Sequence, residues 1–431
     1  MSLQTVSTKL ARIAEQSKRN PAMVFSTLAH LMDEDFLKEA FHQLRKNAAV
    51  GVDQIKAKEY AEDLEGNIRE LHKRLVERSY KAQPARRAWA KKDDGSQRPL
   101  AILALEDKIV QRAVVMLLEA VYESMFHEFS FGFRRGRSAH QALTYLRQQC
   151  LELNINWILD VDIQKFFDSI DRGHLREILK RRVNDGTILR LIGKWLNAGV
   201  LEEEKIVTTE NGTLQGAVIS PILANIFLHT VLDDWFKHEV EPRIRGRCFL
   251  VRFADDFVCG FQYRGDAERV FEELPKRFEK YGLTIHPKKS RLVQFSRPYW
   301  SKGKGPGTFD FLGFTHYWGK TRAGGWTIKR MTQKKRQRRF MKALWEWCKR
   351  NRHERVKEQH QMLCAKLRGH YQYYGVRGNY KMLEVVFEHA ERAWKRWLGR
   401  RTRNGKITCE VFHNMYRKVF PLPKPRIVHT F

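Results

Sequence analysis

The sequence lacks the features that would indicate a membrane span, a zinc knuckle or a disulfide framework. Its six cysteines, at positions 150, 248, 259, 348, 364 and 409, never fall in a CxxC pair, which favours reduced thiols over paired or metal-bound ones. No apolar run reaches the length of about 18 residues that a spanning helix needs, and residues 1–20 are polar, without a signal-peptide core. These absences predict a soluble cytoplasmic protein.

Acidic residues are scarce in the last quarter of the chain. From Lys320 to Phe431 there are 30 Lys and Arg against 7 Glu and no Asp, a balance of +23, whereas all 431 residues together carry +31. A surplus of this size predicts a phosphate polyanion as partner. Because 42% of the residues are hydrophobic and 12% aromatic, the chain is predicted to fold around apolar cores, unlike a disordered basic tail.

Helical and strand patterns alternate over most of the chain. Residues 1–75 have helical periodicity, broken by a turn at Gly51-Val52-Asp53, and are predicted to form an N-terminal helical extension. Residues 76–315 begin with a predicted β-hairpin that has a basic tip, and strands and helices then alternate. This order of elements predicts an α+β fold.

The pattern changes after Phe314. Strands are predicted to end there, and residues 316–431 are predicted to form a basic helical bundle with a proline-stiffened tail. The expected helices span residues 331–352, 355–374 and 380–398. Their aromatic residues suit either the core of the bundle or a platform on which bases stack.

Three aspartates at the ends of predicted strands give the strongest chemical signal. Asp162 ends an apolar stretch, and Asp255 and Asp256 form a turn between two β-prone runs. An aspartate pair in a hairpin turn is, taken alone, most often a turn feature. However, such turns prefer Asn-Gly, and converging carboxylates are what two Mg²⁺ ions roughly 3.5–4 Å apart require. In so basic a chain the pattern predicts two-metal phosphoryl transfer on nucleic acid.

The chain resembles the group II intron-encoded reverse transcriptases of bacterial type. Asp162-Ile163-Gln164-Lys165-Phe166-Phe167-Asp168 resembles the family's first catalytic motif, and Phe253-Ala254-Asp255-Asp256 resembles its second. The resemblance implies a right-hand polymerase fold, with fingers and a palm that has a central antiparallel sheet, over residues 76–315. An α-helical thumb, or maturase (X) domain, is implied to follow. Two Mg²⁺ ions, with Mn²⁺ as an alternative, are implied at Asp162, Asp255, Asp256 and the backbone of Ile163.

The resemblance also implies a nucleotide pocket. Phe167 matches the aromatic that lies beneath the sugar and blocks a 2′-hydroxyl, with a core aromatic as the alternative. Gln215, in Gln215-Gly216-Ala217-Val218-Ile219-Ser220-Pro221, is implied to lie near the incoming sugar. The cations implied to clamp the triphosphate are Lys91, Lys92 and Arg98, and the choice between the two lysines stays open. Lys289 matches the lysine proposed as proton donor to pyrophosphate.

Further positions are implied to grip nucleic acid. Phe253 stands where the family usually has tyrosine, next to the primer end. Gly313 lies in Phe309-Asp310-Phe311-Leu312-Gly313-Phe314, which resembles the hairpin that holds the primer, and Arg368 and Tyr374 belong to the implied thumb. Gln54 also departs from the family, which commonly has glycine there.

The resemblance implies an RNA-directed DNA polymerase that extends a DNA or RNA primer on an RNA template with dNTPs. It further implies a splicing maturase that binds group II intron RNA and a DNA target, without a membrane partner. No Cys/His cluster of an HNH nuclease follows the thumb, so DNA endonuclease activity is not expected. Two alternatives are a domesticated relative in phage defence or CRISPR adaptation, and an RNA-binding maturase with little polymerase activity.

Overall fold

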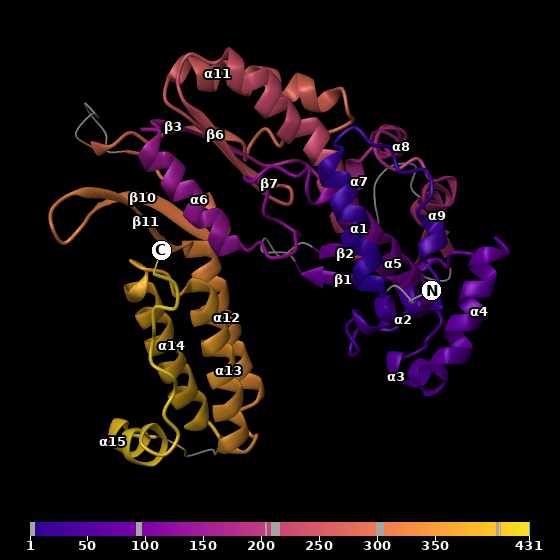
Figure 1. The fold of residues 1–431 in the computed structure, drawn as a ribbon. Coiled ribbons are helices and arrows are strands. Elements are labelled where there is room, and N and C mark those ends of the chain that lie inside the picture. The colour runs from indigo at the N-terminus through magenta and orange to yellow at the C-terminus, as the bar shows by residue number, and fades with distance from the viewer. Residues whose placement is uncertain are drawn as a thin grey trace. The chain divides into compact units, whose positions relative to one another are not determined.

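The computed structural model describes residues 5–91, 97–202, 205–207, 216–298, 306–401, 405 and 407–430. The chain divides into two compact units: unit 1 comprises Met1–Ala142 and Val161–Leu292, and unit 2 comprises Leu143–Asp160 and Val293–Phe431 (Figure 1). None of the helices in the described ranges is both long and apolar enough to cross a bilayer. The division into an extension, a fingers-and-palm region and a thumb stays a prediction.

Unit 1 begins with helices that pack on α5 (Leu105–Tyr122), a helix buried on most of its surface. Carboxylate caps start several of these helices: the Asp33 side chain accepts from the Phe36 N–H at the start of α2, and Asp53 accepts from the Leu105 N–H of α5 at 2.7 Å. The helical extension predicted from periodicity is therefore present as helices. Its elements are α1 (Val6–Arg19), η1 (Ala29–Leu31), α2 (Glu34–His42), α3 (Ala57–Tyr60), η2 (Ala61–Asp63) and α4 (Leu64–Val76).

The predicted basic hairpin is formed by β1 (Ala85–Lys91) and β2 (Gln97–Ile102), which pair antiparallel with Ala88 opposite Leu100. β4 (Val200–Glu202) and β5 (Lys205–Val207) extend this sheet in the order β2-β1-β4-β5. Four further helices occur in this stretch of the chain: α6 (Ala139–Glu152), α7 (Phe166–Ser169), α8 (Arg172–Lys180) and α9 (Gly186–Asn197).

A second four-stranded sheet has the order β6-β7-β3-β8. Its strands are β3 (Trp157–Val161), β6 (Cys248–Phe253), β7 (Asp256–Phe261) and β8 (Arg291–Gln294). β6 and β7 are buried along nearly their whole length, so both faces of this hairpin are covered. The helical elements that accompany it are α10 (Ser220–Leu228), the π-helical segments η3 (His229–Asp233) and η4 (Phe236–Val240), η5 (Glu241–Arg243) and α11 (Arg264–Glu279). The predicted mixture of helices and sheets is confirmed.

Unit 2 corrects one prediction, because the strands do not end at Phe314. β10 (Phe314–Lys320) and β11 (Trp326–Thr332) form a long antiparallel hairpin, and β9 (Phe309–Phe311) completes a sheet of order β11-β10-β9 (Figure 1, orange). In β10 every second residue from Phe314 to Trp318 is buried, which is the period of a half-buried strand. Arg330 places a charged residue on the buried face of β11, so the alternation of a half-buried strand is not visible in the sequence.

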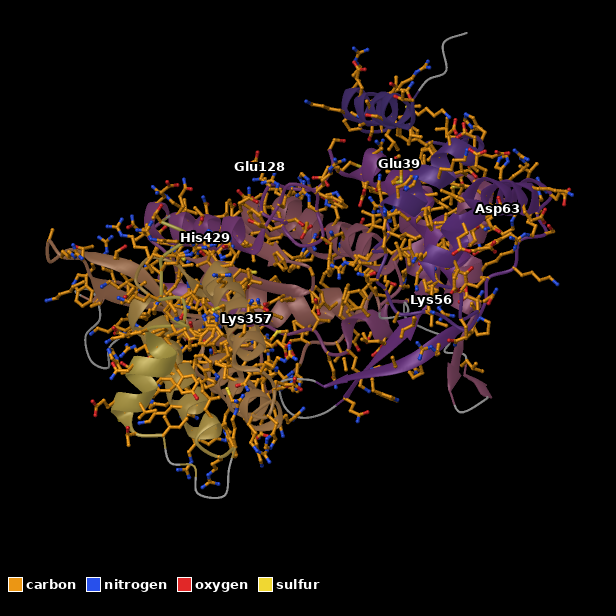
Figure 2. All side chains as sticks on the ribbon, turned by 90° about the horizontal axis from the view of Figure 1, so that it is seen from below. Glu39, Lys56, Asp63, Glu128, Lys357 and His429 are labelled. Atoms are coloured by element: carbon orange, nitrogen blue, oxygen red, sulfur yellow. The ribbon has the colours of Figure 1, made fainter. Side chains whose placement is uncertain are left out.

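A three-helix bundle follows, as predicted, with α12 (Lys334–Arg350), α13 (Val356–Tyr374) and α14 (Tyr380–Leu398) side by side (Figure 1). Tyr371 and Trp394 are each 1% exposed and belong to its core, so these aromatics pack the bundle. Past α15 (Cys409–Val411) and η7 (Phe412–Arg417), the tail returns to α13, where a ring nitrogen of His429 is 2.8 Å from the Gln372 carbonyl oxygen (Figure 2).

Candidate active site

The aspartate pair lies at the tip of the β6–β7 hairpin. Phe253 pairs with Asp256, which leaves Ala254 and Asp255 as the two turn residues. Ala254 has a φ of 59°, a left-handed conformation that favours glycine in such a turn and costs a residue with a Cβ about 1–2 kcal/mol. Asp255 is half-buried and Asp256 is exposed. Backbone strain at a functional turn persists where the surroundings enforce it.

A buried arginine enforces this turn. Nη1 of Arg252 donates to the Ala254 carbonyl oxygen and to Oδ1 of Asn225, both at 3.0 Å. The same guanidinium donates from Nε to Oδ1 of Asp233 at 2.7 Å and from Nη2 to Oδ2 at 2.5 Å. Both side chains are 0% exposed. A bidentate pair of this kind fixes orientation as well as distance. This pair was not predicted from the sequence, in which its one signal is an arginine inside the apolar run of β6.

The loop before α6 supports the turn from the other side. Ser130 forms a parallel bridge with Arg252, the Phe131 N–H donates to the Arg252 carbonyl at 2.8 Å, and the Arg252 N–H donates to Phe129. A Cβ on Gly132 would lie 2.1 Å from the Ala254 nitrogen, so only glycine allows this approach. The loop at residues 129–132 therefore has a structural role at the Asp-Asp turn.

Asp162 directly follows β3 and is held through its backbone. Its carbonyl accepts from the His286 N–H at 2.8 Å, and the Gln164 N–H donates to Thr284 at 2.8 Å. These two bonds flank the antiparallel bridge between Ile163 and Ile285. In such a bridge the middle residue's own N–H and C=O point away from the partner strand, so the Ile163 backbone is not used by this pairing.

The structure brings Lys289 to Asp162. Its Nζ is 3.0 Å from Oδ2 of Asp162, and the two side chains are 62% and 45% exposed. A pair this exposed adds little stability. The arrangement nevertheless places a proton-bearing cation at the carboxylate where the sequence implies a metal ion.

The carboxylates suit hard cations such as Mg²⁺, since Asp162, Asp255 and Asp256 all offer oxygens that solvent reaches. They do not form a compact group by themselves. Within the described ranges, the set of three His, Cys, Asp or Glu ligand atoms that lies within 4.8 Å is formed by His127, Asp234 and His238. Like charges repel, so gathering the three aspartates requires cations.

Phe167 lines a cavity of about 690 Å³ in unit 1. Its neighbour Phe166 is buried, and the two rings meet edge to face with centroids 5.2 Å apart. Gly216 and Pro221, from the segment implied to bind the nucleotide, line the same cavity. Oε1 of the buried Gln111 accepts from the Ile219 N–H at 3.2 Å and fixes this segment. Phe167 is thus a wall of a cavity and not a core residue.

Four of the expected triphosphate and sugar contacts fall where little is described. Lys92 and Gln215 lie outside the described residues. Lys91 and Arg98 are described by their backbone: Lys91 pairs with Gln97 in the β1–β2 hairpin, and Arg98 pairs with Ala90.

In unit 2, Gly313 and Tyr374 meet. Phe311 pairs with Phe314, so Leu312 and Gly313 form a two-residue turn in which both φ angles are positive, 51° and 77°, as type I′ turns require. A Cβ on Gly313 would lie 2.9 Å from Oη of Tyr374. Arg368 is exposed on α13. Phe253, in unit 1, is half-buried.

Comparison with known proteins supports the family assignment. Residues 90–316, more than half of the chain, match the family described as reverse transcriptase (RNA-dependent DNA polymerase). The chain is 32% identical over 235 residues to Protein YkfC of Escherichia coli strain K12, covering 53% of this chain and 61% of that protein. It is 35% identical over 222 residues to the group II intron-encoded protein LtrA of Lactococcus lactis subsp. cremoris, covering 51% of this chain and 37% of LtrA.

The chain therefore spans less than two thirds of either relative. The family match and the intron-encoded relative confirm the resemblance read from the aspartate motifs, and the mixed helices and sheets agree with the implied fold. The chain belongs to the reverse transcriptase (RNA-dependent DNA polymerase) family and has that family's right-hand polymerase fold.

Proposed function

We propose that the chain is an RNA-directed DNA polymerase that adds dNTPs to a primer on an RNA template. The observation that carries this proposal is the Asp-Asp turn, which a strained Ala254 and the buried Arg252 hold in one conformation. A turn that costs stability and presents two carboxylates is expected where those carboxylates do chemistry.

In this mechanism Asp162, Asp255 and Asp256 hold the catalytic ions, with the Ile163 carbonyl as a further oxygen ligand. Two Mg²⁺ ions, or Mn²⁺ in their place, would activate the primer 3′-hydroxyl and neutralise charge on the leaving group. The chain's own contribution is positioning: the backbone bonds at His286 and Thr284 fix Asp162, and Arg252 fixes the turn.

Lys289 is proposed to hold the proton that the leaving pyrophosphate receives, because its Nζ already lies 3.0 Å from Oδ2 of Asp162. Lys91 or Lys92, together with Arg98, is proposed to bind the triphosphate, and Gln215 to lie near the sugar. Phe167 is proposed to reject ribonucleotides, since it forms an apolar wall of the cavity that also contains Gly216.

The proposed macromolecular partners are an RNA template, a DNA or RNA primer, group II intron RNA and a DNA target, met in the cytoplasm. The balance of +23 over the last 112 residues supports them, because Lys and Arg release counterions from phosphates on binding. Gly313, Arg368, Tyr374 and Phe253 are proposed to contact the template–primer. The same charge supports a maturase role, in which the chain stabilises folded intron RNA.

Extension of a labelled DNA primer annealed to RNA, with Mg²⁺ and dNTPs, tests the polymerase. Wild type should extend the primer, and Asp255→Asn should abolish extension because a metal ligand is lost. Asp35→Asn is the matched control, since Asp35 is a 75% exposed aspartate on α2 whose ion pair with Lys38 is long, 3.8 Å. If wild type extends no better than Asp255→Asn, the polymerase proposal is wrong and an RNA-binding maturase remains.

A further inference from the structure

A cluster of histidines and one aspartate lies away from the Asp-Asp turn, within unit 1. One ligand atom from each of His127, Asp234 and His238 lies within 4.8 Å of the others. Nε2 of His127 is 2.8 Å from Oδ1 of Asp234. The reverse transcriptase chemistry proposed above uses none of these side chains.

The local fold positions each of the three side chains. The His127 ring stacks on Phe129, with centroids 4.9 Å apart and planes at 10°, and its carbonyl accepts from Nη1 of the buried Arg134 at 2.7 Å. Asp234 and His238 are four residues apart, so they share one helix face. Asp234 lies between the π-helical segments η3 and η4, and His238 lies within η4. π-Helical insertions occur often at functional sites.

A buried histidine completes the cluster and supplies a second, independent observation. His229 is 4% exposed, and its Nε2 faces Oδ1 of Asp234 at 3.6 Å. Its Nδ1 is buried and has no hydrogen-bond partner among the described residues, but Oδ2 of Asp233 lies 3.9 Å away. Metal-bound histidines typically bind through one ring nitrogen and direct the other toward a carboxylate, which is the arrangement that His229 approaches.

We propose that His127, Asp234 and His238 bind a borderline divalent transition ion, with Zn²⁺ as the physiological candidate, and that His229 is the fourth ligand. Imidazole nitrogens with one carboxylate suit Zn²⁺ or Co²⁺, whereas Mg²⁺ prefers oxygen ligands alone. Ligand bonds of about 2.0–2.2 Å require a modest contraction of the 4.8 Å group, which side-chain rotation supplies. Glu128, next to His127 in the sequence, projects outward from the ribbon (Figure 2). His238 is exposed, so ions can reach the cluster from solvent.

The site would be structural and would act on the Asp-Asp turn at a distance. Asp233, which faces Nδ1 of His229, is also the buried partner of Arg252. Arg252 in turn holds the Ala254 carbonyl. An ion bound to the helix that carries Asp234 would therefore hold Asp233 in the position that Arg252 requires.

Co²⁺ titration of chelator-treated full-length protein, in excess Mg²⁺, tests the proposal. Wild type should take up one equivalent with the visible absorption of a tetrahedral Co²⁺ site, and Zn²⁺ should displace it. His238→Ala removes an exposed ligand and should weaken binding by about 100-fold. His238→Cys should restore binding and add a thiolate-to-Co²⁺ charge-transfer band, which a residue outside the ligand set cannot produce.

The matched control is His174→Ala. His174 forms a histidine–carboxylate pair with Asp171 at 3.3 Å but belongs to no described group of three ligands, so Co²⁺ binding should be unchanged. Asp255→Asn should also retain full Co²⁺ binding, which separates this site from the proposed catalytic one. Absence of a stoichiometric Co²⁺ signal in wild type, or an equal signal in His238→Ala, would show that the cluster is a hydrogen-bonded network without a metal.

Discussion

The buried pair of Arg252 and Asp233 allows a quantitative prediction. Replacing Arg252 by Met keeps much of the side-chain volume but leaves the Asp233 carboxylate, 0% exposed, without its bidentate partner. An uncompensated buried charge costs about 3–5 kcal/mol of the free energy of unfolding. The substitution also removes the hydrogen bond to the Ala254 carbonyl, so the strained turn loses its anchor. We therefore expect a large loss of stability together with a loss of primer extension.

A second variant separates stability from function. Arg252→Met combined with Asp233→Leu removes both charges, and such apolar replacements are often neutral for stability. The double variant should therefore recover most of the free energy of unfolding, measured by urea titration, yet remain defective in primer extension because Ala254 is still unanchored. Glu273→Gln, in the exposed Lys276–Glu273 pair on α11, is the control and should change neither quantity. A loss below about 1 kcal/mol in Arg252→Met, or wild-type extension by the stable double variant, would refute this reasoning.

Three further predictions concern other parts of the chain. Burial lowers the pKa of His370 to about 4 and that of His316 to about 3. In the unfolded chain both histidines have the ordinary pKa of about 6.5, so below pH 6.5 the unfolded chain binds more protons than the folded one. The free energy of unfolding should therefore fall as the pH falls from about 6.5 toward 4. His370→Phe keeps the stacking on Phe340, whose ring centroid is 4.2 Å away, and should flatten that dependence in urea titrations. An equally steep pH dependence of the free energy of unfolding in His370→Phe would show that His370 is not its cause. Gly313→Ala should destabilise unit 2 by about 1–3 kcal/mol, because its φ is 77° and its Cβ would meet Oη of Tyr374; Tyr374→Phe in the same chain should restore part of the loss, and failure to do so would remove Tyr374 as the cause. Phe167→Ala should raise incorporation of rNTPs relative to dNTPs by about 10- to 100-fold in single-nucleotide extension, and an unchanged ratio would exclude Phe167 as the sugar discriminator.

Local sequence patterns predicted most helices and strands but not the side-chain contacts that hold them in place. The helices of the bundle and the β6–β7 hairpin followed from periodicity, and the aspartates followed from strand ends and charge. The β10–β11 hairpin was missed because Arg330, a charged residue, occupies a buried position of β11 and is 2% exposed. Whether a side chain is buried by packing between distant segments cannot be predicted from a sequence window of a few residues.

The contacts around the Asp-Asp turn show the same limit. Arg252 is explained by Asp233, 19 positions earlier, and by the loop at Gly132, over a hundred positions earlier. The His127 cluster joins a loop after α5 to two helical segments far along the chain. Neither group of residues has a spacing that matches a known sequence motif. Their side chains meet only after the β6–β7 hairpin and the helices that cover it have formed.

Phe253 and Ala254 explain how the turn can depart from common residue choices and still keep its shape. Phe253 is positioned by its backbone pairing with Asp256, which requires no side-chain hydroxyl. Ala254 carries the left-handed φ where glycine would be favoured, while Gly132 opposite it has no side chain. Glycine at 254 would relieve the strain but widen the range of turn conformations. In this chain the glycine is Gly132 in the supporting loop, and the turn residue Ala254 has a Cβ. The Cβ limits the conformations open to the turn, and Arg252 and the loop then hold it in the one observed.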